Sequence, residues 1–277
     1  MKARYAIVFS LADEAGKSIA EKLLALERWR ECSLAKPGSK CWYNEEFESI
    51  LAGFPEDSIY MEFLDDFLEP NAYIFISRHS SSSGEPTLSI HHTGNPTSRA
   101  EYGGNPRELS YVLPRLSKKL LLEYWRAAEE RGLLGEYSFT LEATHHGPTS
   151  LRRPLVFVEI GSGPGQWRDK RAQEAAAQTI MATVGASRLP GCRPAIGIGG
   201  THYPDKHTRI MLESEICYGH IFAKYVLSEF DREVLIQAME KSLEPVREII
   251  ILKVPSKVRR IAEAIAKEKN VEVKIYK

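Results

Sequence analysis

Residues 155–184 of the chain read LVFVEIGSGPGQWRDKRAQEAAAQTIMATV. The first six residues are apolar enough to form a strand that is buried on both faces. Gly161, Gly163 and Gly165 interrupt this run, and the alanine- and glutamine-rich residues 168–184 are typical of a helix. A buried strand that is followed by a glycine turn and a helix indicates an α/β sheet with helices packed on it.

The same alternation of strand and helix patterns runs along most of the chain. Short apolar or alternating runs predict further strands at residues 5–10, 72–77, 87–91, 137–142, 195–198, 249–253 and 271–276. Apolar residues at helical spacing predict helices at 15–29, 116–131, 228–242 and 256–269. We therefore expect an α/β fold with a mixed, mostly parallel sheet and helices on both faces. A length of 277 residues suits a single domain, residues 1–277, in which residues 228–277 could form a small C-terminal lobe.

All eight histidines lie between His79 and His220, and most of them sit among small, turn-forming residues. They occur in the segments SRHSSSSGEP, TLSIHHTGNP, EATHHGPTS and GIGGTHYPDKH. Each of these segments follows or ends a predicted strand, and in α/β sheets functional sites collect at the carboxyl ends of strands. We therefore expect the histidine loops to meet in one crevice.

Imidazole is the commonest protein ligand of zinc and the side chain that titrates nearest neutral pH, so the cluster suggests a metal or acid–base site. The motif H-E-x-x-H is absent, so a zinc site would be assembled from separate loops. The candidate nitrogen and oxygen ligands are His79, His91, His145, His146 and His202, with Glu142 and Glu159 nearby. Each of them alone is better explained as a hydrogen-bonded structural residue, whereas the set together predicts metal binding.

Two other features suggest where a substrate could bind. The glycines of GSGPGQW leave backbone amides free before a helix, which is a natural site for an anion or an oxyanion, although a tight turn without ligand explains them too. Arg152-Arg153 and the run that starts at Arg168 flank the histidine and glycine loops and suit a substrate that carries phosphate. Solvated surface charge explains these arginines equally well.

Composition and charge exclude several classes of protein. There are 37 basic and 37 acidic residues, which argues against a surface that binds DNA over its whole extent, and no recognised nucleic-acid-binding motif is present. No run reaches the ~18 apolar residues that span a bilayer, and the first residues do not resemble a signal peptide. Without any C-x-x-C spacing, we interpret the cysteines as reduced thiols of a cytoplasmic protein; they are Cys32, Cys41, Cys192 and Cys217.

The motifs SRH, SSSSGEPTLSIH with GN, EATHHGPTS, VEIGSGPGQW and GIGGTHY run in order from residue 77 to 203. In this set the chain resembles the archaeal and plant type of D-aminoacyl-tRNA deacylase. The resemblance implies a zinc-containing hydrolase that cleaves the ester between a D-amino acid and the 3′ end of tRNA. It also implies a fold similar to peptidyl-tRNA hydrolases and nucleoside phosphorylases, broad tolerance of the amino acid side chain, and two zinc ions in a monomer. The last 70 residues add little to the resemblance.

The resemblance assigns roles to residues at the matching positions. The metal ligands that it implies are His79, His91, His145 and His202. The catalytic residues are His145, His146, Glu142 and Glu159. The substrate-binding residues are Ser83, Thr87, Asn95, Gly161, Gly163, Gly199, Gly200 and Tyr203, to which we add Arg152 and Arg168 for the tRNA. His92 follows a matching histidine as a local variation, and His207 and His220 are not carried over.

The chemistry of an activated ester fits these residues. Zinc-bound water is acidic enough to be hydroxide near neutral pH, or a neutral imidazole or Glu159 could take a proton from water. Two other functions stay open at this point. One is a nucleoside phosphorylase-like transferase that uses the glycine loop for phosphate, and the other is a non-catalytic protein that binds tRNA ends or metal.

Overall fold

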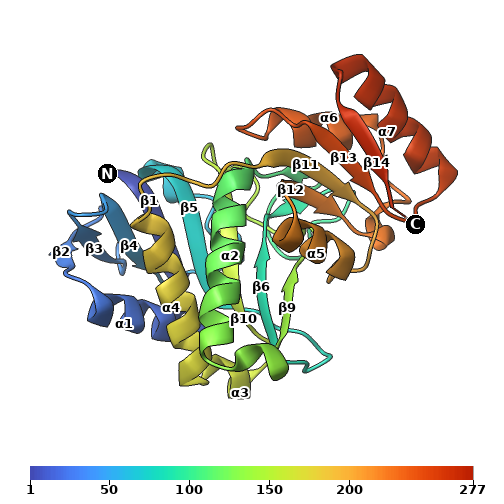
Figure 1. Cartoon of the computed structure of the whole chain (residues 1–277). Helices are drawn as coiled ribbons and strands as arrows, with labels where there is room; N and C mark the ends of the chain where they lie inside the picture. Colours follow the sequence, from blue (N-terminus) through green and yellow to red (C-terminus); the bar gives the residue numbers. More distant parts are fainter. Residues whose placement is uncertain (277) are drawn as a thin grey trace.

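The computed structural model describes residues 1–276, and within them the chain forms two large sheets that lie next to each other (Figure 1). The larger sheet has eight strands in the order β2-β3-β4-β1-β5-β10-β6-β9. Their bounds are β1 (Lys2–Ser10), β2 (Arg30–Cys32), β3 (Lys40–Asn44), β4 (Ser49–Phe54), β5 (Glu69–Arg78), β6 (Thr87–His91), β9 (Ser138–Leu141) and β10 (Leu155–Gly161). Strands β4, β1, β5 and β10 are parallel, whereas β6 is antiparallel to β10 and parallel to β9.

Three helices cover one face of the larger sheet, namely α1 (Glu14–Leu26), α2 (Pro114–Glu130) and α4 (Lys170–Val184). Helix α1 begins where the Asp13 carboxylate accepts the backbone N–H of Gly16, which satisfies one of the free amides of the first turn. Its apolar residues Ile19 and Leu23 are fully buried against the sheet. Burial of such an apolar stripe provides most of the stability of a helix of this length.

The opposite face of the larger sheet packs against the short turns η1 (Ser58–Tyr60) and η2 (Leu64–Asp66) and the loop 142–154. The Glu62 carboxylate, between these turns, accepts the backbone N–H groups of Thr149 and Ser150. Asp65 accepts the backbone N–H of Arg152. The acidic residues of this region therefore hold the loop that carries the central histidines.

The second sheet is parallel and has the order β12-β11-β13-β14. Its strands are β11 (Arg193–Ile198), β12 (Ile216–Phe222), β13 (Glu248–Ile251) and β14 (Glu272–Ile275), and its helices are α5 (Asp205–Glu213), α6 (Arg232–Glu240) and α7 (Ser256–Lys269). The remaining elements are β7 (Gly94–Asn95), β8 (Glu108–Leu109), α3 (Pro164–Trp167), η3 (Leu133–Gly135) and η4 (Lys224–Val226). Helix α2 contacts both β6 and β12, so it joins the two sheets.

The mixed, mostly parallel α/β class predicted from the sequence is confirmed. The sequence did not predict strands β2 to β4, helix α5 or strand β12, and helix α6 is shorter than the predicted 228–242. The division into a single domain with a small C-terminal lobe stays a prediction.

The prediction that all four cysteines are reduced thiols is wrong for this structure, which contains two disulfides. Cys32 pairs with Cys41, its register partner on the neighbouring strand, and Cys192 pairs with Cys217. Their Cα atoms lie 4.9 Å and 5.8 Å apart, within the reach of a disulfide. Sequence spacing alone missed them because strand pairing brings these residues together.

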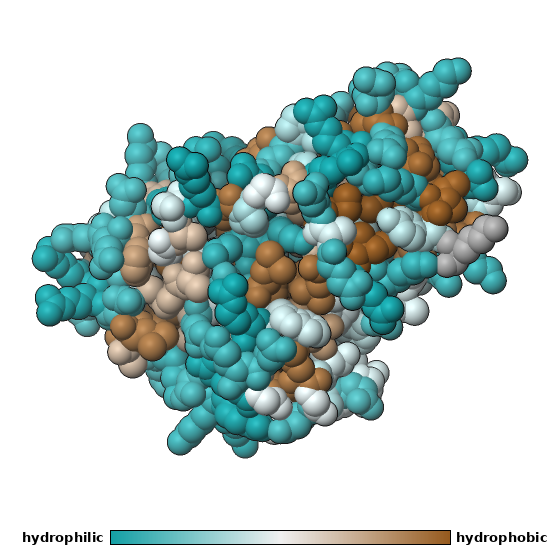
Figure 2. Space-filling view, viewed as in Figure 1, coloured by the Kyte–Doolittle hydropathy of each residue, from teal (hydrophilic) through white to brown (hydrophobic). Residues whose placement is uncertain are grey.

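The face that carries α1, α2 and α4 is mainly hydrophilic, with apolar patches near the second sheet (Figure 2). Among the residues described, no helix combines the length and the apolar character that crossing a membrane requires.

Candidate active site

Two buried carboxylates lie at the centre of the site. Glu159 is on β10 and Glu142 follows β9, and their side chains are 5% and 0% exposed. The Oγ of Ser77, the register partner of Glu159 on β5, donates a hydrogen bond of 2.6 Å to Glu159 Oε1. Glu159 faces away from the three helices, because its neighbours Val158 and Ile160 pack into the core beneath them.

The site lies over the face of the larger sheet, at the point where the strand direction reverses. Strand β6 is antiparallel to β10, and its last residue, His91, is the register partner of Phe157. Phe157 and Glu159 point to the same face because they are two residues apart on one strand. His91 therefore reaches Glu159 from the direction opposite to His79, which follows β5. The histidine loops meet as expected. They do so over the face of the sheet, however, and not along one edge where all strands have their carboxyl ends.

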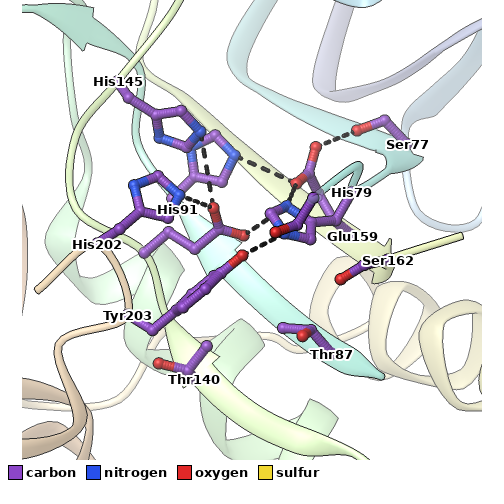
Figure 3. Close-up of polar contacts among 12 residues, drawn as sticks. Ser77, His79, Thr87, His91, Thr140, His145, Glu159, Ser162, His202 and Tyr203 are labelled. Carbon is purple, nitrogen blue, oxygen red and sulfur yellow. Dashed lines mark hydrogen bonds and ion pairs between the residues drawn. The ribbon is translucent and has the colours of Figure 1, made fainter. Parts of the chain in front are cut away.

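The imidazoles surround the two carboxylates (Figure 3). His79 Nδ1 lies 3.2 Å from Glu142 Oε1 and 3.4 Å from Glu159 Oε2, and His91 Nε2 lies 3.6 Å from Glu159 Oε2. His202 Nε2 and His145 Nε2 lie 2.8 Å and 3.6 Å from Glu142 Oε2. One cluster thus combines side chains that are up to 123 positions apart in the sequence (79 to 202).

Backbone contacts place the histidines of the loop 142–154 and of the turn after β11. The N–H groups of Ala143 and Thr144 donate to the carbonyls of His202 and Ile221, so this loop is bonded to the second sheet. Gly199 and Gly200 have φ values of +101° and +92°, which favour glycine. They allow the sharp turn after β11 that brings His202 back to the cluster.

A small residue is also needed at the end of β10. A Cβ atom at Gly161 would lie 2.6 Å from the Cβ and Cδ2 atoms of His79. The missing side chain therefore leaves the space in which the His79 imidazole packs.

Hydrogen bonds fix the proton positions of two central imidazoles. His145 Nδ1 lies 2.8 Å from the carbonyl oxygen of Ala143, and His146 Nδ1 lies 2.6 Å from that of Gly147. A carbonyl oxygen can only accept, so in both neutral rings Nδ1 carries the hydrogen. Nε2 then carries a lone pair, which can bind a metal or accept a proton.

Burial and charge divide the imidazoles into two kinds. Burial opposes protonation of His79, but Glu159 and Glu142 outweigh it and raise its pKa to about 9. The same carboxylates raise the pKa of His91 against its burial. Burial, together with the neighbouring imidazoles, lowers the pKa of His145 well below its usual value and that of His146 to about 4. The carboxylates therefore stabilise positive charge on His79 and His91, whereas burial keeps His145 and His146 neutral.

The donor atoms of this cluster fit a metal. Three groups have ligand atoms that all lie within 4.8 Å of one another; they are His91, His145 and His146; Glu142, His145 and His202; and His79, Glu142 and Glu159. The buried atoms His91 Nε2 and Glu142 Oε1 form no hydrogen bond with any residue in the described part of the chain. Zinc binds imidazole nitrogen and carboxylate oxygen atoms. A buried polar atom without a hydrogen-bond partner lowers the stability of the fold unless a ligand binds to it.

Two cavities open onto the cluster, of about 540 Å³ and about 500 Å³. They share one wall, which consists of Tyr102, His145, His146 and His202. The first cavity extends towards Asp13 and Asp57, and the second towards Asn95 and Tyr225.

The structure places only some of the predicted substrate-binding residues at these cavities. Tyr203 lines the first cavity, and its hydroxyl lies 2.6 Å from His79 Nε2. Asn95 lines the second, where its amide donates to the carbonyl of Gly103. Ser83 and Thr87 belong to the serine-rich turn and the start of β6, and the Thr87 hydroxyl donates to the carbonyl of Glu85.

The glycine loop and the arginines lie farther out. The carbonyl of Gly163 accepts the N–H groups of Gln166 and Trp167, the last two residues of α3. Of the described residues that line the first cavity, none comes from the segment 161–165. Arg152 pairs with Asp65, and Arg168 pairs with Glu14 at 2.5 Å. Contacts of these residues with substrate stay predictions.

The three remaining histidines have structural partners. His92 Nδ1 bonds the carbonyl of Leu155, His207 Nδ1 lies 2.9 Å from the Tyr218 hydroxyl, and His220 bonds the carbonyl of Ser110.

The structure adds residues that the sequence analysis did not single out, namely Ser77, Arg78, Tyr102 and Tyr225. Ser77 and Arg78 belong to the SRH motif, so their position next to His79 could have marked them as site residues. No sequence pattern marks the two tyrosines.

A family model described as D-aminoacyl-tRNA deacylase matches residues 66–274 of the chain. The chain belongs to this family. The resemblance drawn from the motifs is thereby confirmed, and so is the class of hydrolases that act on ester bonds.

Relatives in the deacylase family match over nearly the whole chain. The D-aminoacyl-tRNA deacylase of Hyperthermus butylicus is 42% identical over an alignment of 277 positions that covers 97% of this chain and 98% of that protein. That of Staphylothermus marinus is 42% identical over 250 residues, covering 90% and 89%. The crystal structure of AF0625, described as a conserved protein of unknown function, superposes with a TM-score of 0.90 and 31% identity, covering 99% of this chain and 95% of that one.

Proposed function

We propose that this chain hydrolyses the ester bond between a D-amino acid and the 3′ end of tRNA, and that zinc at the histidine cluster assists the reaction. The observation that carries the proposal is the cluster of Glu142, Glu159 and five imidazoles, three of which belong to the wall that the two cavities share. In an aminoacyl ester the amino acid lies on one side of the carbonyl and the ribose of the tRNA on the other. A reactive centre with a cavity on either side suits such a substrate. The family name and the relatives support the same reaction.

Glu142, His145 and His202 are the group that we assign to a catalytic zinc. His145 and His202 are 24% and 31% exposed and line both cavities, whereas the other oxygen-containing group is buried. A catalytic zinc keeps one position open to substrate, which only a partly exposed group allows. Zinc there would supply Lewis acidity, which polarises an ester carbonyl and acidifies water. For the second zinc that the resemblance implies, His79 and Glu159 would join the other oxygen of Glu142.

The protein's own residues handle the proton and the substrate. His146 lines both cavities and its Nε2 carries a lone pair, so we assign it as the group that accepts a proton from the attacking water. The Tyr203 hydroxyl, beside His79, donates a hydrogen bond to the ester. Glu159 is less suited to act as base because its oxygens contact Ser77 and the imidazoles of His79 and His91.

The products follow from the balance of atoms. The water oxygen forms a bond to the carbonyl carbon, and the bond from that carbon to the ribose oxygen breaks. The ribose oxygen takes the proton held by His146, and the amino acid leaves as a carboxylate with release of one proton to solvent.

The size of the first cavity supports broad tolerance of the amino acid side chain. We infer from the proposed tRNA substrate that the protein acts in the cytoplasm; disulfides in intracellular proteins are known from hyperthermophiles. We further infer that it acts as a monomer, and its balanced charge gives no support to a role on DNA or membranes.

The test is a deacylation assay with D- and L-tyrosyl-tRNA, using protein that has been treated with chelator and then resupplied with zinc. We expect release of D-tyrosine, sparing of the L-ester, loss of rate on chelation and recovery with zinc. Elemental analysis should find zinc in the wild-type protein and less zinc in His145→Ala. Equal hydrolysis of both esters, or of neither, would contradict the proposal.

A further inference from the structure

The two cavities at the cluster are nearly equal in volume, so size does not decide which part of a substrate each one holds. Their chemistry does differ. The first cavity is lined by the carboxylates of Asp13, Asp57 and Glu159, by Arg78 and His79, and by serine residues. Asp13 and Glu159 are buried, and a buried carboxylate attracts the positively charged amino group of an aminoacyl ester more strongly than an exposed carboxylate does.

The second cavity presents an exposed aromatic ring. Tyr225 is the middle residue of η4 and is 56% exposed, with its hydroxyl 3.3 Å from His202 Nδ1. Its ring is tilted by 35° from the His202 ring, at a centroid distance of 6.2 Å. Tyr102, on the wall that both cavities share, is 65% exposed. Exposed tyrosines beside a reactive cluster offer flat surfaces on which a base can stack.

Charge in the second cavity favours a neutral ligand over a phosphate. Glu101 and Glu229 line it together with Arg99, so carboxylates outnumber the guanidinium. The Glu229 carboxylate accepts the backbone N–H of Ser98, which holds it at the second cavity. A phosphate would be repelled there, whereas a nucleoside carries no charge and has an aromatic face.

We propose that the second cavity holds the terminal nucleoside of the tRNA, with its base stacked on the Tyr225 ring, while the first cavity holds the amino acid. Tyr102 then separates the two parts of the substrate, and the ester carbonyl lies at His145, His146 and His202. This inference rests on the proposed function and adds the orientation of the substrate. Tyr225 is a positioning residue for the nucleoside.

The test begins with binding, which does not depend on catalysis. The probe is the trinucleotide CCA, titrated into wild-type protein, Tyr225→Ala, Tyr225→Phe and Tyr60→Ala with calorimetric detection. Loss of one stacked base should weaken binding of CCA to Tyr225→Ala by about 5- to 150-fold. Tyr225→Phe keeps the ring and should bind within about twofold of wild type. Tyr60 is also 56% exposed and lines neither cavity, so Tyr60→Ala should bind like wild type.

A second measurement separates stacking from an effect through His202. The value of kcat/KM is measured for D-tyrosyl-tRNA and for D-tyrosine ethyl ester, which lacks a nucleoside. We expect Tyr225→Ala to lose more activity towards the tRNA ester than towards the ethyl ester, by the factor lost in CCA binding. Equal losses on both esters, or CCA binding that Tyr225→Ala leaves unchanged, would overturn the nucleoside assignment. If wild-type protein binds CCA through Tyr225 but cleaves neither ester, the proposed reaction fails and the binding site stands.

Discussion

At the scale of single residues, Glu142 connects most of the site. Its side chain is fully buried, one oxygen contacts His79, and the other contacts His145 and His202. A buried carboxylate is stable only with partners of opposite charge or with a metal. Glu142 therefore holds the imidazoles of three separate loops around one carboxylate.

The variant Glu142→Gln keeps the shape of this side chain and removes its charge. We expect kcat/KM for D-tyrosyl-tRNA to fall by at least about 100-fold. The variant loses a carboxylate of the proposed zinc site and the negative charge that balances the imidazoles. Elemental analysis should show less zinc than in wild type. Glu240→Gln, on the exposed side of α6, serves as the control and should keep full activity. A Glu142→Gln protein with normal rate and zinc content would remove this residue from the site.

The sequence allowed the histidines and both glutamates to be predicted because they occur in turns with distinctive neighbours. Tyr225 could not be found in this way. The role that we propose for it rests on exposure of the ring and on its distance from His202, and no short pattern of residues records either quantity.

At the scale of elements, the turn after β10 sets the space for His79. Gly161 and Gly165 both lie in the segment GSGPG, yet their surroundings differ. A Cβ atom at Gly161 would lie 2.6 Å from His79, whereas at Gly165 it would meet nothing within 4 Å. The sequence alone predicts the same role for both glycines, which is to leave backbone amides free.

We expect Gly161→Ala to displace the His79 imidazole. A shift of about 1 Å in a site residue can cost about 100-fold in rate, and overpacking costs about 1–3 kcal/mol of stability. Gly165→Ala in the same turn should leave both quantities near wild type. Thermal unfolding and kcat/KM for D-tyrosyl-tRNA, measured on both variants, test this; equal behaviour of the two would show that the space at Gly161 is not needed.

Periodicity predicted most buried strands and long helices but not the direction of the strands. The runs at 87–91 and 155–160 are both apolar, and nothing in them shows that β6 runs against β10. Strands β2 and β3 were missed because they are short and half-exposed, with polar residues such as Arg30 and Lys40. In such strands the apolar pattern on which the prediction relies is weak.

At the scale of the whole molecule, buried histidines outside the site link its stability to pH. Burial lowers the pKa of His207 to about 4 and that of His220 to about 3. An unfolded chain protonates these imidazoles near pH ~6.5. Between that pH and about pH 4 the unfolded state therefore binds more protons, and the free energy of unfolding falls as the pH falls.

The variant His220→Gln isolates one of these contributions. Below pH ~6, the free energy of unfolding of wild type should fall more steeply than that of the variant, by up to ~1.4 kcal/mol per pH unit. Urea unfolding at several pH values between 5 and 8.5 measures both slopes. Above pH ~7.5 the imidazole is neutral in both states, so the difference in slope should vanish there. Parallel curves at low pH would mean that His220 is protonated in the folded protein.

The loop 142–154 is bonded at its start to the second sheet, through Ala143 and Thr144, and farther along to Glu62 beneath the larger sheet. His145 and His146 lie between these anchors, and His202 lies in the turn that follows β11 of the second sheet. The cluster of imidazoles thus lies where the two sheets meet. A change in how the two sheets pack would change the spacing of the imidazoles, so packing far from the cluster, along α2 for example, helps to set its geometry.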